Sequence, residues 1–155
     1  MPAAAPPILD DEESDAADLQ IVLTRYVDSF DGYTEAAKVV ESSSLAAAFL
    51  EIAARRKTIV KQVSALIENQ GEQPDREGSS EAAVHRWWIR VRAQMTEEDF
   101  KATLEECVRG EQELARTIQR ALETGHLSPA HAAILSHVAD ELLLSLKTFK
   151  SAIGR

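Results

Sequence analysis

The chain has 155 residues and a mass of 17.0 kDa, which is close to the usual size of one domain with a single hydrophobic core. Its 45% apolar and 28% charged residues exclude a chain disordered by composition, and its longest apolar run, Leu45–Leu50, is far shorter than the roughly 20 residues of a membrane span. The net charge of −9 repels polyanions, so we expect no nucleic-acid partner and no membrane partner.

The N-terminal fifteen residues combine three prolines and three alanines with an acidic cluster. This composition predicts a disordered acidic tail over 1–15 and a folded part over 16–155. Beyond the tail only Pro74 and Pro129 remain, each in a break between apolar segments, and Ala, Leu, Glu, Arg and Lys dominate between the breaks. We therefore predict an all-α protein.

Apolar residues at spacings of three and four predict five helices. The serine run 42–44 separates the first helix from the second, while Gly71 and Gly125 end the second and the fourth. Ser128 and Pro129 form a cap and a first-turn proline for the last helix. The predicted ranges are about 16–41, 45–70, 81–95, 97–124 and 129–153.

The lengths of these helices predict their arrangement. Four of them have about 25 residues, or about 38 Å, and the third is shorter. Two long helices joined by a short turn, a long connection that carries the short helix, and two more long helices joined by a short turn are typical of ferritin-like bundles. We therefore expect an antiparallel four-helix bundle with one long crossover carrying a short fifth helix.

Two charged residues interrupt the predicted buried faces near the middle of their helices. At 100° per residue, Arg56 lies about 20° from Leu45 on the second helix, and Glu111 lies about 20° from Phe100 on the fourth. An isolated buried charge is costly, so we expect Arg56 and Glu111 to form a structural ion pair across the core. Replacing Glu111 by Gln would then strand Arg56 at a cost of roughly 3 to 5 kcal/mol.

A metal site is the alternative interpretation of Glu111. Di-iron bundles use Glu-x-x-His pairs, which the chain lacks, and an arginine at the level of Glu111 would repel a cation. We therefore predict no cofactor and no catalytic residue, and keep iron or manganese on Glu111, Glu141 and His137 as the alternative. Glu141 lies at the edge of its apolar stripe, where a carboxylate is usually solvated.

One basic and aromatic segment stands out on this acidic chain, and its candidate residues are His85, Arg86, Trp88 and Arg92. A crossover helix usually lays its tryptophan on the bundle and extends its arginines into solvent. The same residues would also suit a patch that binds an unknown protein partner. Both interpretations remain open at this point.

Several short motifs resemble, in order and spacing, a bacterial ferritin-like four-helix-bundle family of unknown function, over about Leu19–Leu122. The motifs are Asp31-Gly32-Tyr33 with Ala36-Ala37, Arg55-Arg56, Gly78-Ser79, His85-Arg86-Trp87-Trp88 and Glu106-Cys107-Val108-Arg109-Gly110-Glu111. The resemblance implies the ferritin-like fold, a soluble bacterial protein and a connection to stress or metals. Its pattern has glutamate at two positions where this chain has Lys38 and Gln62, which removes two carboxylates.

Together these patterns predict a non-enzymatic helical bundle that serves as a binding or structural module with a stress-related role. The stripe widths leave both a monomer and a homodimer open. The single Cys107 cannot form an intramolecular disulfide and no secretory segment is visible, so we expect a cytoplasmic location. A di-metal oxidase or metal-storage protein is the alternative function.

Overall fold

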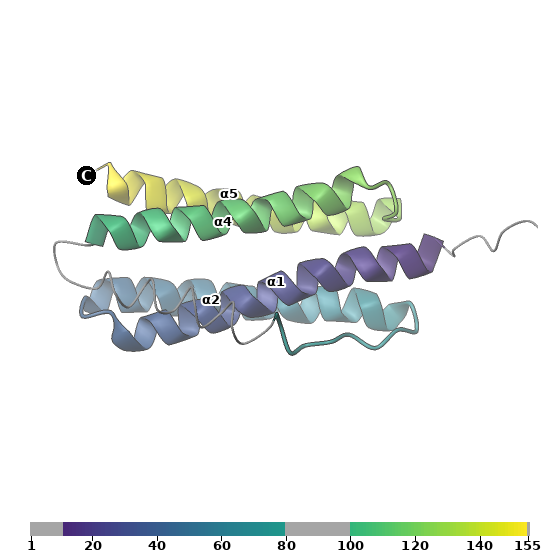
Figure 1. Cartoon of the computed structure of the whole chain (residues 1–155), viewed down its shortest axis with the longest axis horizontal. Helices are drawn as coiled ribbons and strands as arrows, with labels where there is room; N and C mark the ends of the chain where they lie inside the picture. The colour runs from purple at the N-terminus through teal and green to yellow at the C-terminus, as the bar shows by residue number, and fades with distance from the viewer. Residues whose placement is uncertain (1–10, 80–99, 155) are drawn as a thin grey trace, which may run out of the picture.

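The computed structural model describes residues 11–79 and 100–154, which fold into four long α-helices without a β-strand in these two ranges (Figure 1). The helices are α1 (Asp11–Val39), α2 (Ser43–Asn69), α4 (Phe100–Glu123) and α5 (Pro129–Ile153). The predicted all-α class is confirmed. The predicted short helix over 81–95 lies outside the described residues.

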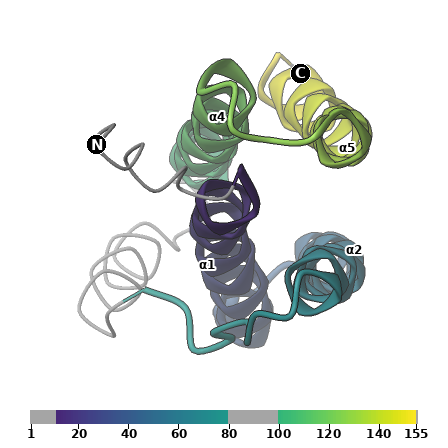
Figure 2. The ribbon, with the colours of Figure 1, turned by 90° about the vertical axis from the view of Figure 1, so that its right-hand side faces the viewer.

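The helices form two antiparallel hairpins that pack against each other. Helix α1 pairs with α2 and α4 pairs with α5, while α1 lies beside α4 and α2 beside α5 (Figure 2). Neighbouring helices run in opposite directions around the bundle (Figure 1). None of the described helices is long and apolar enough to cross a membrane.

The helix ends follow the signals in the sequence. Ser42 caps α2 by accepting a hydrogen bond from the Leu45 amide at 3.2 Å, and Ser128 caps α5 in the same way with His131 at 3.2 Å. Gly71 follows α2 with a φ of +80°, a left-handed conformation that costs glycine little. These caps place the helix boundaries within a few residues of the predicted ones.

Helix α1 begins earlier than the sequence predicts. It starts at Asp11, inside the predicted tail over 1–15. Asp15 is only 3% exposed, and its Oδ2 lies 2.8 Å from His131 Nδ1 in the first turn of α5. The acidic cluster that predicts a solvated tail therefore supplies a buried carboxylate that joins α1 to α5.

The segment after α2 returns along the outer side of α1 as an extended strap, residues 70–79 (Figure 1). Asp75 is held by both its backbone groups, because its N–H donates to Gln20 Oε1 and its carbonyl accepts from Gln20 Nε2, each at 2.9 Å. Further on, the Ser79 amide donates to Asp28 Oδ1 at 2.8 Å. Eight residues of helix, about 12 Å, separate these two attachment points on α1.

The apolar core is divided into two clusters, one in each half of the bundle. The first holds the residues near the α2–strap end and includes Leu19, Val63, Ile118 and Leu135. The second, at the opposite end, includes Ala36, Phe49, Leu104 and Phe149. A layer of buried polar residues lies at the level between them.

Candidate functional site: a buried arginine layer

The polar layer is built around Arg56, the central residue of α2. Its side chain is fully buried, with an exposed fraction of 0%, and Glu111 on α4 is 1% exposed. Arg56 Nη2 donates to Glu111 Oε1 at 2.7 Å. The structure thus places in direct contact the two charged residues that the sequence analysis singles out.

A tyrosine completes the surroundings of the buried carboxylate. The Tyr33 hydroxyl on α1 donates to the same Glu111 Oε1 at 2.8 Å. The centre of the Tyr33 ring lies 5.9 Å from the guanidinium carbon of Arg56. The centre of the Tyr26 ring, also on α1, lies 5.6 Å from the same carbon. The cation is therefore covered by two aromatic rings as well as paired with a carboxylate.

A second carboxylate, Glu141, reaches the layer from the middle of α5. Its Oε2 lies 3.4 Å from Arg56 Nε, and its Oε1 accepts from Arg55 Nε at 3.0 Å. Ser145, one turn further along α5, is 3.4 Å from Arg56 Nη2. The side chain of Glu141 is 16% exposed, so the expectation of a solvated edge carboxylate is replaced by one that bridges two arginines.

Burial controls the ionisation of the layer. It raises the pKa of Glu111 above its usual value, and Arg56 and the hydrogen bond from Tyr33 offset part of this increase. Burial acts to lower the pKa of Arg56, but Glu111 and Glu141 outweigh it and the pKa rises, so Arg56 stays charged. The pKa of Tyr33 also rises, first through burial and then through Glu111, which keeps its hydroxyl a donor.

The carboxylates of the layer are paired with arginines. Arg56 contacts both Glu111 and Glu141, and Arg55 also pairs with Glu141, so two cations face two carboxylates. The third residue of the metal alternative, His137, lies on the exposed side of α5. Among the described residues no group of three or more His, Cys, Asp or Glu could hold a metal ion. What the layer can do chemically is fix the register of four helices by charge and hydrogen bonding.

Sequence reasoning places Arg56 and Glu111 but misses the roles of Tyr33, Arg55, Glu141 and Ser145. The signal for Glu141 is its position four residues before Ser145, since both then face the helix that carries Arg55 and Arg56. The predicted patch of His85, Arg86, Trp88 and Arg92 lies outside the described residues.

The fold and the layer define an all-helical protein whose two hairpins meet at a buried ion pair. The chain belongs to the family described as a domain of unknown function (DUF2383), whose model matches residues 15–124. This range contains Tyr33, Arg56 and Glu111, whereas Glu141 on α5 lies beyond it. No curated protein and no solved structure matches the chain.

Proposed function

We propose that this chain is a non-enzymatic helical bundle of ferritin-like organisation that serves as a binding or structural module with a stress-related role in the bacterial cytoplasm. A structural ion pair occupies the level at which ferritin-like bundles carry their metal ligands. The observation that supports the proposal most is the 2.7 Å contact between Arg56 Nη2 and Glu111 Oε1, with Tyr33 donating to the same oxygen.

The charges of the layer explain why this contact favours a structural role. Arg56 holds a permanent positive charge at the place where a metal ion would have to bind, and this charge repels a metal cation. A metal ion would have to displace the guanidinium, which would leave it buried and unpaired. The bundle is therefore proposed to hold its centre without metal and to use its surface for function, either as a homodimer or with an unknown protein partner.

Elemental analysis tests this proposal. The untagged protein is purified without chelator, and its iron and manganese are measured by mass spectrometry. We expect well under one metal atom per chain, and a melting temperature that EDTA leaves unchanged, because the layer needs no metal to be neutralised.

The alternative, a di-metal oxidase or storage protein, predicts the opposite result. One or two iron or manganese atoms per chain, lost together with stability on chelation, would overturn the proposal. Glu111, Glu141 and His137 would then be the first ligands to replace, with the exposed Glu105 on α4 as a matched control carboxylate.

A further inference from the structure

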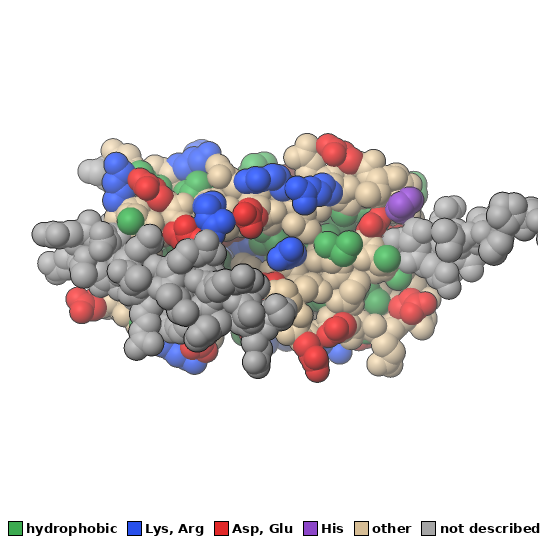
Figure 3. All heavy atoms as spheres, in the orientation of Figure 1, with side chains coloured by type: hydrophobic (Ala, Val, Ile, Leu, Met, Phe, Trp, Pro, Cys, Tyr) green, Lys and Arg blue, Asp and Glu red, His purple; other side chains and the backbone are tan. Residues whose placement is uncertain are grey.

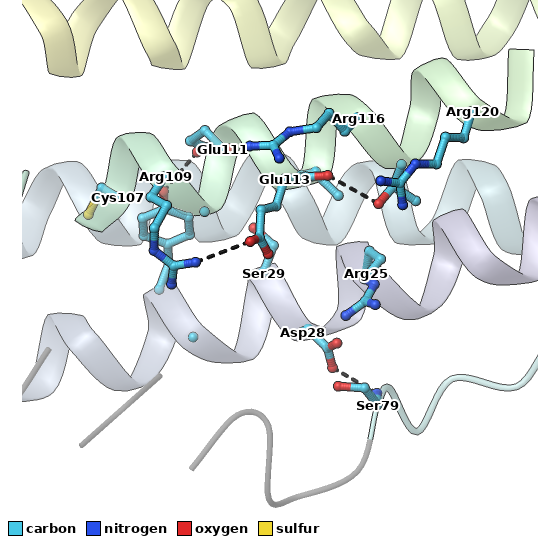
Figure 4. A pocket seen from close by; sticks show the side chains of 15 residues that line it. Arg25, Asp28, Ser29, Ser79, Cys107, Arg109, Glu111, Glu113, Arg116 and Arg120 are labelled. Atoms are coloured by element: carbon cyan, nitrogen blue, oxygen red, sulfur yellow. Dashed lines mark hydrogen bonds and ion pairs between the residues drawn. The ribbon is translucent and has the colours of Figure 1, made fainter. Parts of the chain in front are cut away.

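A cleft of about 420 Å³ opens between α1 and α4, and its lining includes Tyr33 and Glu111 of the buried layer. This volume lies within the range of small-molecule sites in proteins. Four arginines line the cleft, Arg25 on α1 and Arg109, Arg116 and Arg120 on α4 (Figure 4). The chain has a net charge of −9, so this gathering of cations is a local reversal of its overall charge.

Three of these arginines lack a carboxylate partner in the part of the chain that the structure describes. Arg25, Arg116 and Arg120 form no ion pair with any acidic residue in the described parts of the chain. Three acidic residues line the cleft, and each has a partner. Glu113 pairs with Arg109 at 3.1 Å, Glu111 pairs with the buried Arg56 at 2.7 Å, and Asp28 accepts from the Ser79 amide. In the space-filling view, basic side chains follow one another along α4 above the cleft (Figure 3).

The helix register brings the three arginines to one end of the cleft. Arg116 and Arg120 are four residues apart, so they share one face of α4. Helices α1 and α4 are antiparallel, and the Tyr33–Glu111 hydrogen bond fixes their alignment. Arg25 lies eight residues before Tyr33 on α1. In the antiparallel pair this is level with the position eight residues after Glu111 on α4, which lies between Arg116 and Arg120.

An unpartnered buried hydroxyl lines the same cleft. Ser79 Oγ is buried but has no hydrogen-bond partner among the described residues, although the backbone of Ser79 is fixed on Asp28. A buried hydroxyl without a partner is uncommon and is expected to find one in a bound ligand. It offers a neutral donor in the lining of the cleft.

We propose that the α1–α4 cleft binds a small molecule with at least two oxyanion groups, phosphate or carboxylate, held by Arg25, Arg116 and Arg120. The planar guanidinium binds both kinds of group through two parallel hydrogen bonds. Three such cations around one cavity exceed the charge of a single carboxylate and suit a ligand of higher charge. This site goes beyond the proposed bundle function and does not use Arg56.

Isothermal titration calorimetry on the full chain tests the site with two probes, pyrophosphate for phosphate and citrate for carboxylate. The test variant is R25Q/R116Q/R120Q. The matched control is K101Q/K147Q/K150Q, which removes the same charge from exposed positions that do not line the cleft. Circular dichroism of each variant checks that it is folded.

We expect the wild-type chain to bind at least one probe at one site per chain. The cleft variant should lose more than about tenfold in affinity and the control less than about twofold. Ser79→Ala should lose roughly two- to tenfold. Tighter binding of pyrophosphate assigns phosphate as the natural group, and tighter binding of citrate assigns carboxylate.

Two results would overturn the site. The first is the absence of binding of either probe by the wild-type chain at about 1 mM, the weak end of specific affinities. The second is an equal loss of affinity in the cleft variant and the control variant, which would show that binding depends only on the net charge of the protein.

Discussion

Arg56 and Glu111 contribute unequally to the stability of the buried layer. Glu111 has a raised pKa, so its charge is held at a cost, whereas the charge of Arg56 is permanent and is shared with Glu141 at 3.4 Å. Removing the charge of Glu111 therefore leaves Arg56 with one carboxylate. Removing Arg56 leaves two carboxylates without their common cation.

We therefore expect Arg56→Met to destabilise the protein by about 3 to 5 kcal/mol at neutral pH. Glu111→Gln should cost only about 1 kcal/mol, because the amide oxygen can still accept from Arg56 and Tyr33. This value is smaller than the roughly 3 to 5 kcal/mol expected from the sequence alone. The larger value assumes that Glu111 is the only partner of Arg56. Urea denaturation followed by circular dichroism gives both values.

The double variant R56M/E111L and the pH dependence are the controls. With both charges gone, most of the lost stability should return. In R56M alone, Glu111 loses the cation that lowers its pKa, so its pKa rises further above 4.5. A carboxyl group whose pKa is higher in the folded than in the unfolded state favours folding at low pH, and this contribution is lost as the pH rises. The stability that R56M loses relative to the wild type should therefore become smaller when the pH is lowered from about 8 to about 4.5. A deficit that stays constant or grows on acidification would contradict this account of the layer.

At the scale of elements, the strap depends on one close approach. Gly78 has a φ of +82°, and a Cβ atom there would lie 2.7 Å from Asp28 Oδ1, the acceptor that fixes Ser79. Gly71 has nearly the same φ, +80°, but a Cβ atom there would meet nothing within 4 Å. The two glycines therefore separate backbone strain from loss of the strap contact.

We expect Gly71→Ala to cost about 1 kcal/mol through its left-handed backbone and Gly78→Ala about 2 kcal/mol or more. Hydrogen exchange should also show loss of protection at the Ser79 amide in Gly78→Ala only, because Asp28 must move away. Equal costs and unchanged protection of the Ser79 amide would show that the strap is not held at Asp28.

Element boundaries show where the sequence suffices and where it does not. Ser42, Gly71 and Ser128 act locally, through caps and a left-handed turn, and each marks a helix end correctly. The first turns of α1 instead include Asp15, which contacts His131, a residue far away in the sequence. No local sequence pattern predicts this contact. Local propensity thus predicts a tail where tertiary structure adds a turn of helix.

The polar layer shows the same division. Rotation along each helix places Arg56 and Glu111 on buried faces, and the cost of an unpaired buried charge predicts their contact. Rotation also places Glu141 at the edge of its stripe, but the sequence does not say which helix lies beside that edge. Only the packing of α2 against α5 turns this edge position into a partner of Arg55 and Arg56.

At the scale of the whole molecule, the single thiol reports on opening of the bundle. Cys107 is 2% exposed, and burial, followed by Glu111, raises the pKa of its thiol far above the usual range. The thiolate is the reactive form, so we expect iodoacetamide to label native Cys107 only through opening of the bundle.

Labelling should be fast in urea and should accelerate in R56M about tenfold for each 1.4 kcal/mol of lost stability. Glu111→Gln provides the matched comparison, with an acceleration of only about fivefold for its expected loss of about 1 kcal/mol. If the native thiol reacts as fast as free cysteine, or if R56M leaves its rate unchanged, Cys107 would not report on global opening.

The distribution of charge between the two hairpins also determines which of them can pair. The hairpin of α1 and α2 brings the cation Arg56 to the interface, and the hairpin of α4 and α5 brings the anions Glu111 and Glu141. Two copies of the first hairpin would bury arginine against arginine, and two copies of the second would bury carboxylates together, at a cost of several kcal/mol in either case. Unlike hairpins are therefore compatible, whether they come from one chain or from two, and like hairpins from two chains reject each other during folding.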